Sequence, residues 1–239
     1  MTATVRQVVG GTLAVAFFCV FAGLGTWQVE RRAWKLDLIE RVERRVHAPP
    51  VAAPPKSEWP LVSRVRNEYA HVRVTGVFLP ASQTRVKALT DRGPGFWVMT
   101  AMRLEDDSIV FVNRGFVPED AVGAAAAPSM TPVTVTGLLR MTEPGGAFLR
   151  ANDPPADRWY SRDVRAIAAA RGLQDVAPYF IDADRAAGDD PPHAPVGGLT
   201  VIAFHNNHLI YAITWYTLAL MIPAALWLAR RPMKRATTP

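Results

Sequence analysis

The residues best suited to chemistry lie in the stretch HNNHLIYAITWY, near the C-terminal end of the chain. An imidazole, a phenol and an indole have the i, i+3, i+4, i+7 spacing of one helix face, in the set His208, Tyr211, Ala212 and Trp215. A neutral imidazole can be the axial ligand of a haem iron, aromatic rings can flank a porphyrin, and Asn207 or a backbone carbonyl could orient the imidazole. Alternatively, His208 is only an interfacial residue, as Tyr and Trp are at membrane surfaces.

Two uncharged, mostly apolar segments lie near the ends of the chain. Residues 7–29 and 209–229 make about 23 and about 21 residues, against the roughly 20 that a helix needs to cross a membrane. The first segment runs into a charged stretch without the cleavage site of a signal peptide, so we expect it to be retained. Aromatic residues typical of membrane interfaces lie at the segment ends: Trp27, Tyr211, Trp215, Tyr216 and Trp227. We therefore predict two transmembrane helices, at 7–29 and 208–229.

The charge pattern indicates how these helices are oriented. The tail at residues 230–239 has four cations and no acid, and Arg6 is the only charge ahead of the first helix. Counting charges in these short segments places both termini in the cytoplasm and the middle of the chain outside. Arg31, Arg32 and Lys35 argue against this, but they precede a domain-sized loop, for which the rule is weaker. Without Arg6 and the four cations of the C-terminal tail, the formal charge falls from +6 to +1, so the basic pI does not indicate a nucleic-acid partner.

Catalytic and metal-binding signatures are missing from the sequence. The single cysteine, Cys19, lies in the first apolar segment, which excludes a disulfide framework, haem attachment through C-x-x-C-H and a thiolate pair for copper. No G-x-S-x-G, phosphate-binding Gly-rich loop or H-E-x-x-H occurs. Asp189, Asp190 and His193 could hold a hard metal, but their proline-rich surroundings favour an exposed loop. We therefore do not expect an enzyme.

The middle of the chain changes from helical to strand periodicity. Apolar residues keep helical spacing through 30–48, and the stretch PPVAAPPKSEWP is typical of a proline-stiffened linker, at 49–62. A domain then follows at 63–207, where polar residues alternate with Val72 and Val74 and with Val133 and Val135, as in half-buried strands. Less regular strands are expected at 84–89, 96–104, 109–113, 178–182 and 199–204.

Two further local patterns complete the predicted domain. The stretch SRDVRAIAAARG predicts a helix at 161–171 that Ser161 caps and Gly172 stops. Asp106 and Asp107 are expected to form a turn between two strands. The fold class is therefore a membrane protein of the α+β class. Its two transmembrane helices flank a mostly β extracytoplasmic domain, sandwich-like or barrel-like, with one or two helices.

Several runs of residues resemble the motifs of one known family. The first is LGTWQVERRAWKLDLI, at residues 24–39, and VRVTGVF follows with Gly76. VNRGFVP has Asn113, Arg114, Gly115 and Pro118, and NDPPADRWYSRD has Asn152, Pro154, Trp159, Tyr160, Arg162 and Asp163. PVGGLT and NNHLIYAITWY end the series with Pro195, Gly197, Gly198, Asn207, His208, Leu209, Tyr211, Thr214 and Trp215. In this order they cover nearly the whole chain, and together they resemble the Surfeit locus protein 1 family of cytochrome c oxidase assembly factors.

The resemblance implies a function in assembling the respiratory chain. Members of this family help to build the haem-copper oxidase, near the insertion of haem a into its largest subunit, subunit I, and haem a synthase is a further expected partner. Bacterial members bind haem a, and the histidine of their NxHLxYAxTW motif is implicated. That position is His208 here, whereas His205 lies outside the motif. The resemblance to bacterial members also implies the inner membrane of a bacterial cell.

The candidate haem site that follows has His208 as the iron ligand. Around it we place Asn207, Tyr211, Trp215, Trp27 and Arg114. Membrane anchoring and packing are the alternative for Trp27, Trp34 and Trp215. Residues 113–115 are expected to form a turn after a strand, with a haem propionate or a partner as the alternative contact of Arg114. The cations at 41–45 are expected to form a solvated face rather than a site for lipid or propionate.

Two functions stay open at this point. The chain is either a haem a carrier and insertion factor, or a scaffold or chaperone that steadies an oxidase subunit and never holds haem. An outward-facing membrane enzyme is the weakest alternative, because no nucleophile can be paired with a base.

Overall fold

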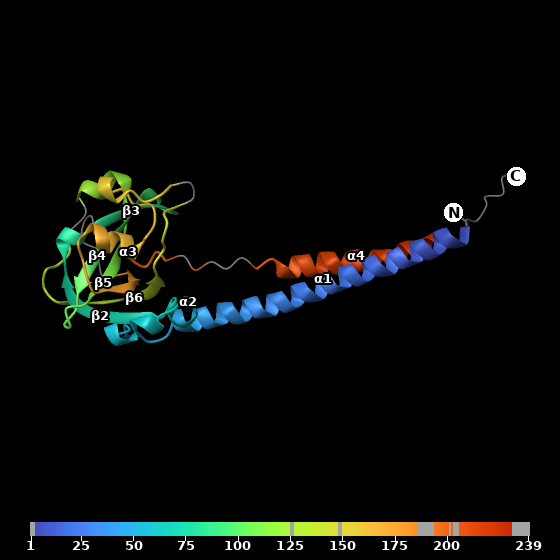
Figure 1. The fold of residues 1–239 in the computed structure, drawn as a ribbon, viewed down its shortest axis with the longest axis horizontal. Helices are drawn as coiled ribbons and strands as arrows, with labels where there is room; N and C mark the ends of the chain where they lie inside the picture. The colour runs from blue at the N-terminus through green and yellow to red at the C-terminus, as the bar shows by residue number, and fades with distance from the viewer. Residues whose placement is uncertain are drawn as a thin grey trace. The chain divides into compact units, whose positions relative to one another are not determined.

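The structure is a computed structural model that describes residues 3–124, 127–147, 150–185, 194–200, 202 and 206–230. It divides into two compact units (Figure 1). The helical unit consists of residues 1–41 and 203–239, and the β unit of residues 42–202.

The helical unit contains the two long helices that the apolar segments predict. α1 spans Ala3–Val46 and α4 spans His208–Arg230. Both are long and apolar enough to cross a membrane. α1 continues past its apolar segment, as the helical spacing predicts, and ends shortly before Pro49, which cannot continue a helix. Its last turn carries Arg44 and Arg45, whose charge is favourable at a helix C-terminus.

α1 and α4 pack side by side (Figure 1). The rings of Phe21 and Trp215 are stacked, with centroids 5.7 Å apart. One helical turn further on, a Cβ added to Gly25 would lie 2.8 Å from Cε1 of Tyr216, so only a glycine allows this close approach. The hydroxyls of Thr26 and Tyr216 are 3.0 Å apart and form a hydrogen bond. In lipid the hydrophobic effect does not drive helices together. Close packing at a small residue, stacked rings and an interhelical hydrogen bond therefore hold α1 and α4 together.

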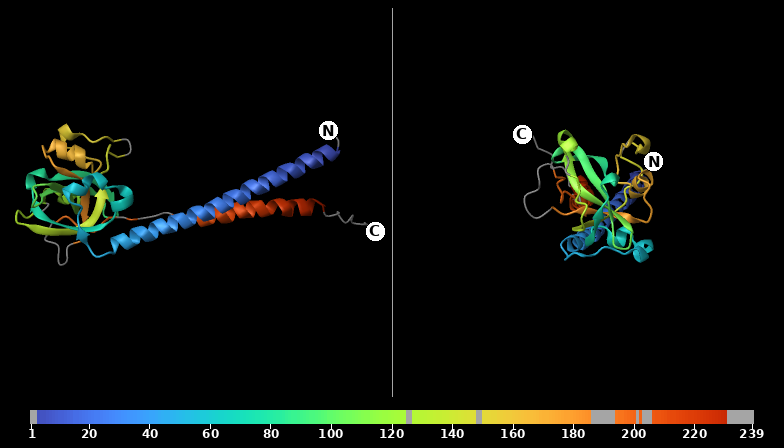
Figure 2. Two further views of the ribbon diagram at one scale, coloured as in Figure 1. Left: turned by 60° about the horizontal axis from the view of Figure 1, so that its bottom comes forward. Right: turned by 90° about the vertical axis from the view of Figure 1, so that its left-hand side faces the viewer.

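The β unit is a seven-stranded sheet that closes on itself (Figure 2). The strands are β1 (Val51–Ala52), β2 (His71–Phe78), β3 (Thr84–Thr90), β4 (Gly93–Arg103), β5 (Ile109–Pro118), β6 (Val133–Met141) and β7 (Val176–Ala183). Their order is β1-β2-β6-β7-β5-β4-β3, and a further pairing of β2 with β4 closes a barrel of β2, β6, β7, β5 and β4. β1–β2 and β5–β7 are parallel, and the other pairs are antiparallel. Of the two predicted architectures, the barrel is the observed one.

Two apolar clusters form the core, one on each face of β5. Val110 and Val112 belong to one cluster with residues of β2, β6 and β7, and Phe111 belongs to the other. The second cluster is covered by the helix α3 (Val164–Ala170), which contributes Ile167. Because both faces of β5 are buried there, its first four residues, 109–112, are all apolar and do not alternate with polar residues.

The predicted linker at residues 49–62 contains structure that packs on the β unit. It includes β1 and the 3₁₀ helix η1 (Lys56–Leu61), and a short helix α2 (Arg64–Asn67) follows. The hydroxyl of Tyr179 donates a hydrogen bond of 2.8 Å to the carbonyl of Pro54, and Trp59 packs against the first core cluster. Three more 3₁₀ helices lie in loops: η2 (Pro80–Ser82), η3 (Glu119–Ala124) and η4 (Pro154–Ala156).

Most local predictions for the β unit are confirmed. Strands occur at six of the seven expected places, and residues 106 and 107 form the turn between β4 and β5. Asp107 adopts a φ of 59°, and Asp106 Oδ1 accepts a hydrogen bond from the N–H of Ser108. Gly172, with φ 64°, follows α3 and ends it as predicted.

Three local predictions were wrong. Residues 113–115 form a bulge within β5 rather than a turn, because two residues there oppose one residue of β4. Asp163, not Ser161, caps α3 by accepting from the N–H of Ala166, since Ser161 Oγ instead accepts from Asn152 Nδ2. No strand occurs at residues 199, 200 and 202, the described part of the expected strand at 199–204. The preceding Gly198 has a φ of 69°, which lies outside the strand region, and its N–H donates to the carbonyl of Ala183.

Candidate functional site

His208 is the first residue of α4, and a side chain of α1 holds its imidazole. Nδ1 of His208 lies 2.7 Å from Oε1 of Gln28. A carboxamide oxygen only accepts hydrogen bonds, so Nδ1 carries a proton and donates it; in the neutral ring this places the lone pair on Nε2. Gln28 is only 9% exposed, so water competes little for this bond. Of the two neutral tautomers, this bond selects the one whose Nε2 can bind a metal.

The residue that orients the imidazole is not the one expected from the sequence. Histidines that bind metals usually donate their other ring N–H to an oxygen, which fixes the ring. Asn207, the expected partner, is exposed, and its backbone carbonyl accepts from the N–H of Tyr211 at 3.3 Å. Gln28 takes this role from a position 180 residues away, so no local spacing could indicate it.

The predicted aromatic face of α4 is divided in the structure. Ala212 is buried, and Trp215 stacks on Phe21, so these two residues lie with His208 on the side of α4 that faces α1. Tyr211 is 53% exposed and lies outside that contact. The side of α4 that packs against α1 thus contains the imidazole and the indole, without the phenol.

The structure describes the surroundings of Trp27 and Arg114, each within its own unit. Trp27 is 53% exposed, although it adjoins the buried Gln28. Arg114 belongs to the β unit, where its guanidinium carbon lies 5.7 Å from the ring of Phe78 and Nη1 donates to Oε1 of Gln83. Burial lowers the pKa of Arg114 below the ordinary value of arginine. Of the six predicted site residues, His208 and Trp215 are therefore the two that share the face against α1.

A further polar atom beside His208 has no partner in the described part of the chain. Oδ1 of Asn206 is buried and accepts no hydrogen bond from any described residue. A buried acceptor without a donor is unfavourable, and such atoms often mark a place where another group binds. His205, Asp189, Asp190 and His193 lie outside the described residues.

The residues of three sequence motifs meet at one buried carboxylate, that of Asp182. Asp182 is 4% exposed and lies in β7. Its oxygens accept from Asn113 Nδ2 at 2.8 Å and from Arg162 Nη1 at 3.0 Å. Further bonds come from Arg140 Nη1 at 3.1 Å and Thr200 Oγ1 at 2.9 Å. Each of three motifs supplies one of these donors: VNRGFVP supplies Asn113, NDPPADRWYSRD supplies Arg162 and PVGGLT supplies Thr200. The sequence analysis did not predict that they share Asp182 as a partner.

The same two arginines extend this ionic network to further carboxylates. Arg140 bonds to Glu68 and Glu143, and Arg162 bonds to Glu143 through two nitrogens. Burial lowers the pKa of Arg140, but the charge of Asp182 and the bond to Glu68 outweigh it, so the net shift is upward and Arg140 stays charged. Removing one member of such a buried network typically costs about 3–5 kcal/mol. The network holds β6, β7 and the segment before α3 together.

In the part of the chain that the structure describes, no three His, Cys, Asp or Glu side chains are grouped so that they could hold a metal ion. A single imidazole with an open Nε2 suits an iron that already has four porphyrin nitrogens. The donor chemistry at His208 therefore fits haem better than a bare metal ion.

Comparison with known proteins identifies the family. The model of the SURF1 family matches residues 15–220. The chain belongs to the SURF1 family. This match includes Gln28, Asp182 and His208, and thus both features described above. SURF1 proteins are cytochrome c oxidase assembly factors, which agrees with the resemblance of the sequence motifs.

Individual relatives show that the similarity extends over most of the chain. Surfeit locus protein 1 of Rattus norvegicus is 35% identical over 216 residues, covering 82% of this chain and 67% of the rat protein. The protein of the same name from Homo sapiens is 34% identical over 218 residues, covering 82% and 69%. A SURF1-like protein of Monosiga brevicollis is 35% identical over 224 residues, covering 87% and 82%.

Proposed function

We propose that this SURF1-family chain binds haem a through His208 and assists its insertion into subunit I of a haem-copper oxidase. The observation that supports this most directly is the bond from His208 Nδ1 to the buried Gln28, which leaves Nε2 open. Haem a is cargo in this proposal, held for transfer to the oxidase. The chain itself acts as a non-enzymatic assembly factor.

The residues of the helical unit each have a task in this proposal. His208 Nε2 ligates the iron, and Gln28 fixes the orientation of the imidazole through Nδ1. Trp215, stacked on Phe21, adds an apolar ring to the same side of α4, suited to contact with a porphyrin or an isoprenoid tail. Oδ1 of Asn206 is an acceptor that a donor on the cargo can satisfy.

The location and the partners of the chain belong to the same proposal. We propose the inner membrane of a bacterial cell, with both termini in the cytoplasm and the β unit outside. Subunit I receives the haem, and haem a synthase supplies it. The basic tail at 230–239 supports this orientation, since short basic segments stay in the cytoplasm.

One observation favours a scaffold that holds no haem. The bond from His208 to Gln28 and the bond from Thr26 to Tyr216 lie in the same seam between α1 and α4. Polar links of this kind strengthen the association of membrane helices without any cargo. In this second candidate function, His208 joins the two helices, and the β unit steadies an oxidase subunit.

The two candidates are distinguished by the visible spectrum of the protein purified from cells that make haem a. If the chain carries haem through His208, His208→Ala should lose the haem absorbance, while His205→Ala should keep most of it. Membrane levels of both variants should be unchanged, and the haem content of the oxidase should fall only with the first. A His208→Ala protein that keeps its haem while the oxidase fails to assemble would instead support the scaffold.

A further inference from the structure

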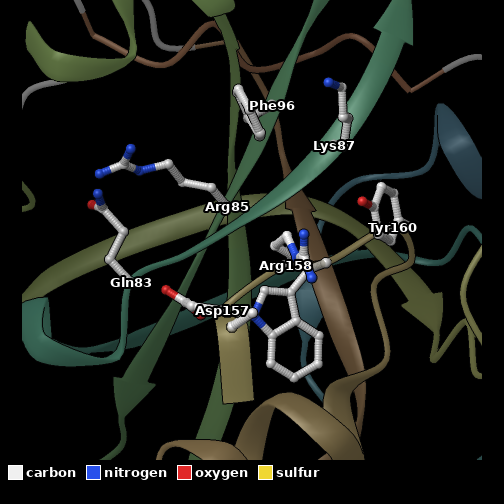
Figure 3. A pocket seen from close by; sticks show the side chains of 9 residues that line it. Gln83, Arg85, Lys87, Phe96, Asp157, Arg158 and Tyr160 are labelled. Atoms are coloured by element: carbon white, nitrogen blue, oxygen red, sulfur yellow. Dashed lines mark hydrogen bonds between the residues drawn. The ribbon is translucent and has the colours of Figure 1, made fainter. Parts of the chain in front are cut away.

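A cavity of about 500 Å³ lies beside β3 in the β unit, separate from the residues assigned to haem. Figure 3 shows the side chains around it, from β3, from β4 and from the loop that follows η4. Those used below are Arg85, Lys87, Phe96, Asp157, Arg158 and Tyr160. None of them takes part in the proposed function.

The cavity has an excess of positive charge. Arg158 is neutralised by Asp153 at 2.5 Å. Asp157 is neutralised in turn by Arg171 at 2.7 Å. The guanidinium of Arg85 is exposed and makes no ion pair or hydrogen bond with any residue that the structure describes. The uncompensated charge of the cavity therefore rests mainly on Arg85.

Lys87 adds a second, weakly paired cation. Its Nζ lies 3.6 Å from Glu119, beyond a good hydrogen bond, and both side chains are about half exposed. An exposed pair of this kind contributes little to stability, so an incoming carboxylate can replace Glu119 at small cost. That Glu119 lies there also means that a carboxylate fits beside Lys87.

The spacing of the two cations matches an extended peptide. Arg85 and Lys87 alternate with the buried Thr84 and Val86, so they lie on one face of β3, about 7 Å apart along the strand. Alternate side chains of an extended guest have the same separation. Phe96 is paired with Lys87 across the strands, and the lysine nitrogen lies 6.0 Å from its ring.

The loop that forms the opposite wall is already fixed in place. Trp159 is 2% exposed, and its carbonyl accepts from the N–H of Lys87 at 2.8 Å. This bond occupies the outer edge of β3 at Lys87, so side chains rather than strand addition must recognise a guest. The neighbouring Tyr160 is half-buried and lines the cavity. The site thus combines two cations and two aromatic rings on a rigid frame.

We propose that this cavity binds a short, extended, acidic segment of a partner protein. Two carboxylates at alternate positions of the segment meet Arg85 and Lys87, and an adjoining apolar side chain lies against Phe96 and Tyr160. Guanidinium–carboxylate contacts give such a site its specificity, and the aromatic rings add apolar contact. Binding here is independent of haem.

The test measures the anisotropy of fluorescein-labelled peptides added to the full chain in detergent. The acidic peptide is acetyl-Gly-Glu-Ser-Glu-Phe-Gly, and its control has both glutamates replaced by glutamines. We expect the acidic peptide to bind more tightly, and its Kd to rise about tenfold or more with Arg85→Gln and Lys87→Gln together. Arg103→Gln is the matched control, because Arg103 is an exposed cation at the end of β4 and does not line the cavity.

Two further measurements separate a peptide site from a general anion site. A peptide with its two glutamates adjacent should bind more weakly, because adjacent side chains of an extended chain point to opposite sides. A chain with Arg85→Glu and Lys87→Glu should lose the acidic peptide and gain the corresponding lysine peptide. Equal binding by the double glutamine variant, equal binding of the glutamine peptide, or displacement of the acidic peptide by equimolar inorganic phosphate would overturn the proposal. Circular dichroism checks that each variant is folded.

Discussion

Two histidines of this chain use their ring nitrogens in opposite ways. His71 has both nitrogens bonded, Nδ1 to the carbonyl of Ala48 at 2.8 Å and Nε2 to Asp184 at 2.8 Å. Two acceptors favour the imidazolium, which cannot bind a metal. His208 has only Nδ1 bonded within the described residues, to the carboxamide of Gln28, and its Nε2 makes no such bond. The residue type does not distinguish these two roles of histidine, whereas the atoms bonded to the ring nitrogens do.

The first prediction concerns the orientation of His208. Gln28→Leu removes the acceptor for Nδ1, so the imidazole should lose its fixed tautomer and bind haem a about tenfold or more weakly. Gln28→Glu keeps an acceptor for Nδ1, so the variant should still bind haem a. The reduction potential of the bound haem should be lower, because a carboxylate partner makes the imidazole a stronger electron-pair donor to the iron. Absorbance titration of the purified chain with haem a measures both effects.

Thr26→Val is the matched control for this titration. It removes the other hydrogen bond of the seam, from Thr26 to Tyr216, and leaves the imidazole and Gln28 in place. Haem binding should therefore be close to that of the unmodified chain. If Gln28→Leu and Thr26→Val behave alike, the His208–Gln28 bond is only a packing link.

The second prediction concerns the pH dependence of His71. Burial lowers its pKa, but the bonds to Asp184 and Ala48 outweigh burial and raise the pKa above 6.5. A raised pKa in the folded state means that the stabilisation is complete below the unfolded value and is lost as pH rises through the folded value. Asp184→Asn should therefore lower the midpoint of thermal unfolding more at about pH 5.5 than at about pH 8.5. An effect independent of pH would mean that His71 is not charged in this pair.

At the scale of elements, the alternation of apolar and polar residues predicted the strands that have one exposed face, and it predicted the other segments less well. β2 alternates in burial along most of its length, and this pattern was visible in the sequence, whereas β6 alternates only over its first three residues. The region 113–115 was misassigned because an Asn-Arg-Gly run is typical of turns, whereas here Gly115 gives room for a second segment. Its N–H donates a hydrogen bond to Oδ1 of Asn113, and Val196 pairs with Phe116 directly beside it.

The third prediction tests this close approach. Gly115 has a φ of 131°, and an added Cβ would lie 2.3 Å from the carbonyl carbon of Val196, which cannot move without breaking the bonds to Phe116. Gly115→Ala should reduce the free energy of unfolding by more than about 2 kcal/mol. Gly93→Ala is the control, since Gly93 has a φ of 92° and open space around it, and it should cost only about 1 kcal/mol of backbone strain. Equal losses in chemical unfolding would show that backbone strain, and not the contact with Val196, decides.

At the scale of the whole molecule, the sequence was sufficient for the two long helices and the β character of the domain between them. Apolar length and alternation are local signals, and both could be identified without any partner. Contacts between distant segments had no such signal. β7 pairs with β5 and β6, Asp182 collects side chains from three motifs, and Gln28 meets His208, all across long separations. The candidate ligand was therefore predictable from the chain, and the residue that orients it was not.

The last prediction concerns the orientation of the chain in the membrane. The tail at 230–239 has four cations without an acid, and short basic segments are retained in the cytoplasm. A reporter fused after Pro239 should therefore be cytoplasmic, and one inserted at 189–192, outside the described residues, should be external. Replacing the four tail cations with glutamine should weaken this preference, whereas replacing Arg31, Arg32 and Lys35 should strengthen it, because those cations oppose it. Reporters labelled on the opposite sides would place the β unit in the cytoplasm and would exclude the proposed delivery of haem a on the outer side.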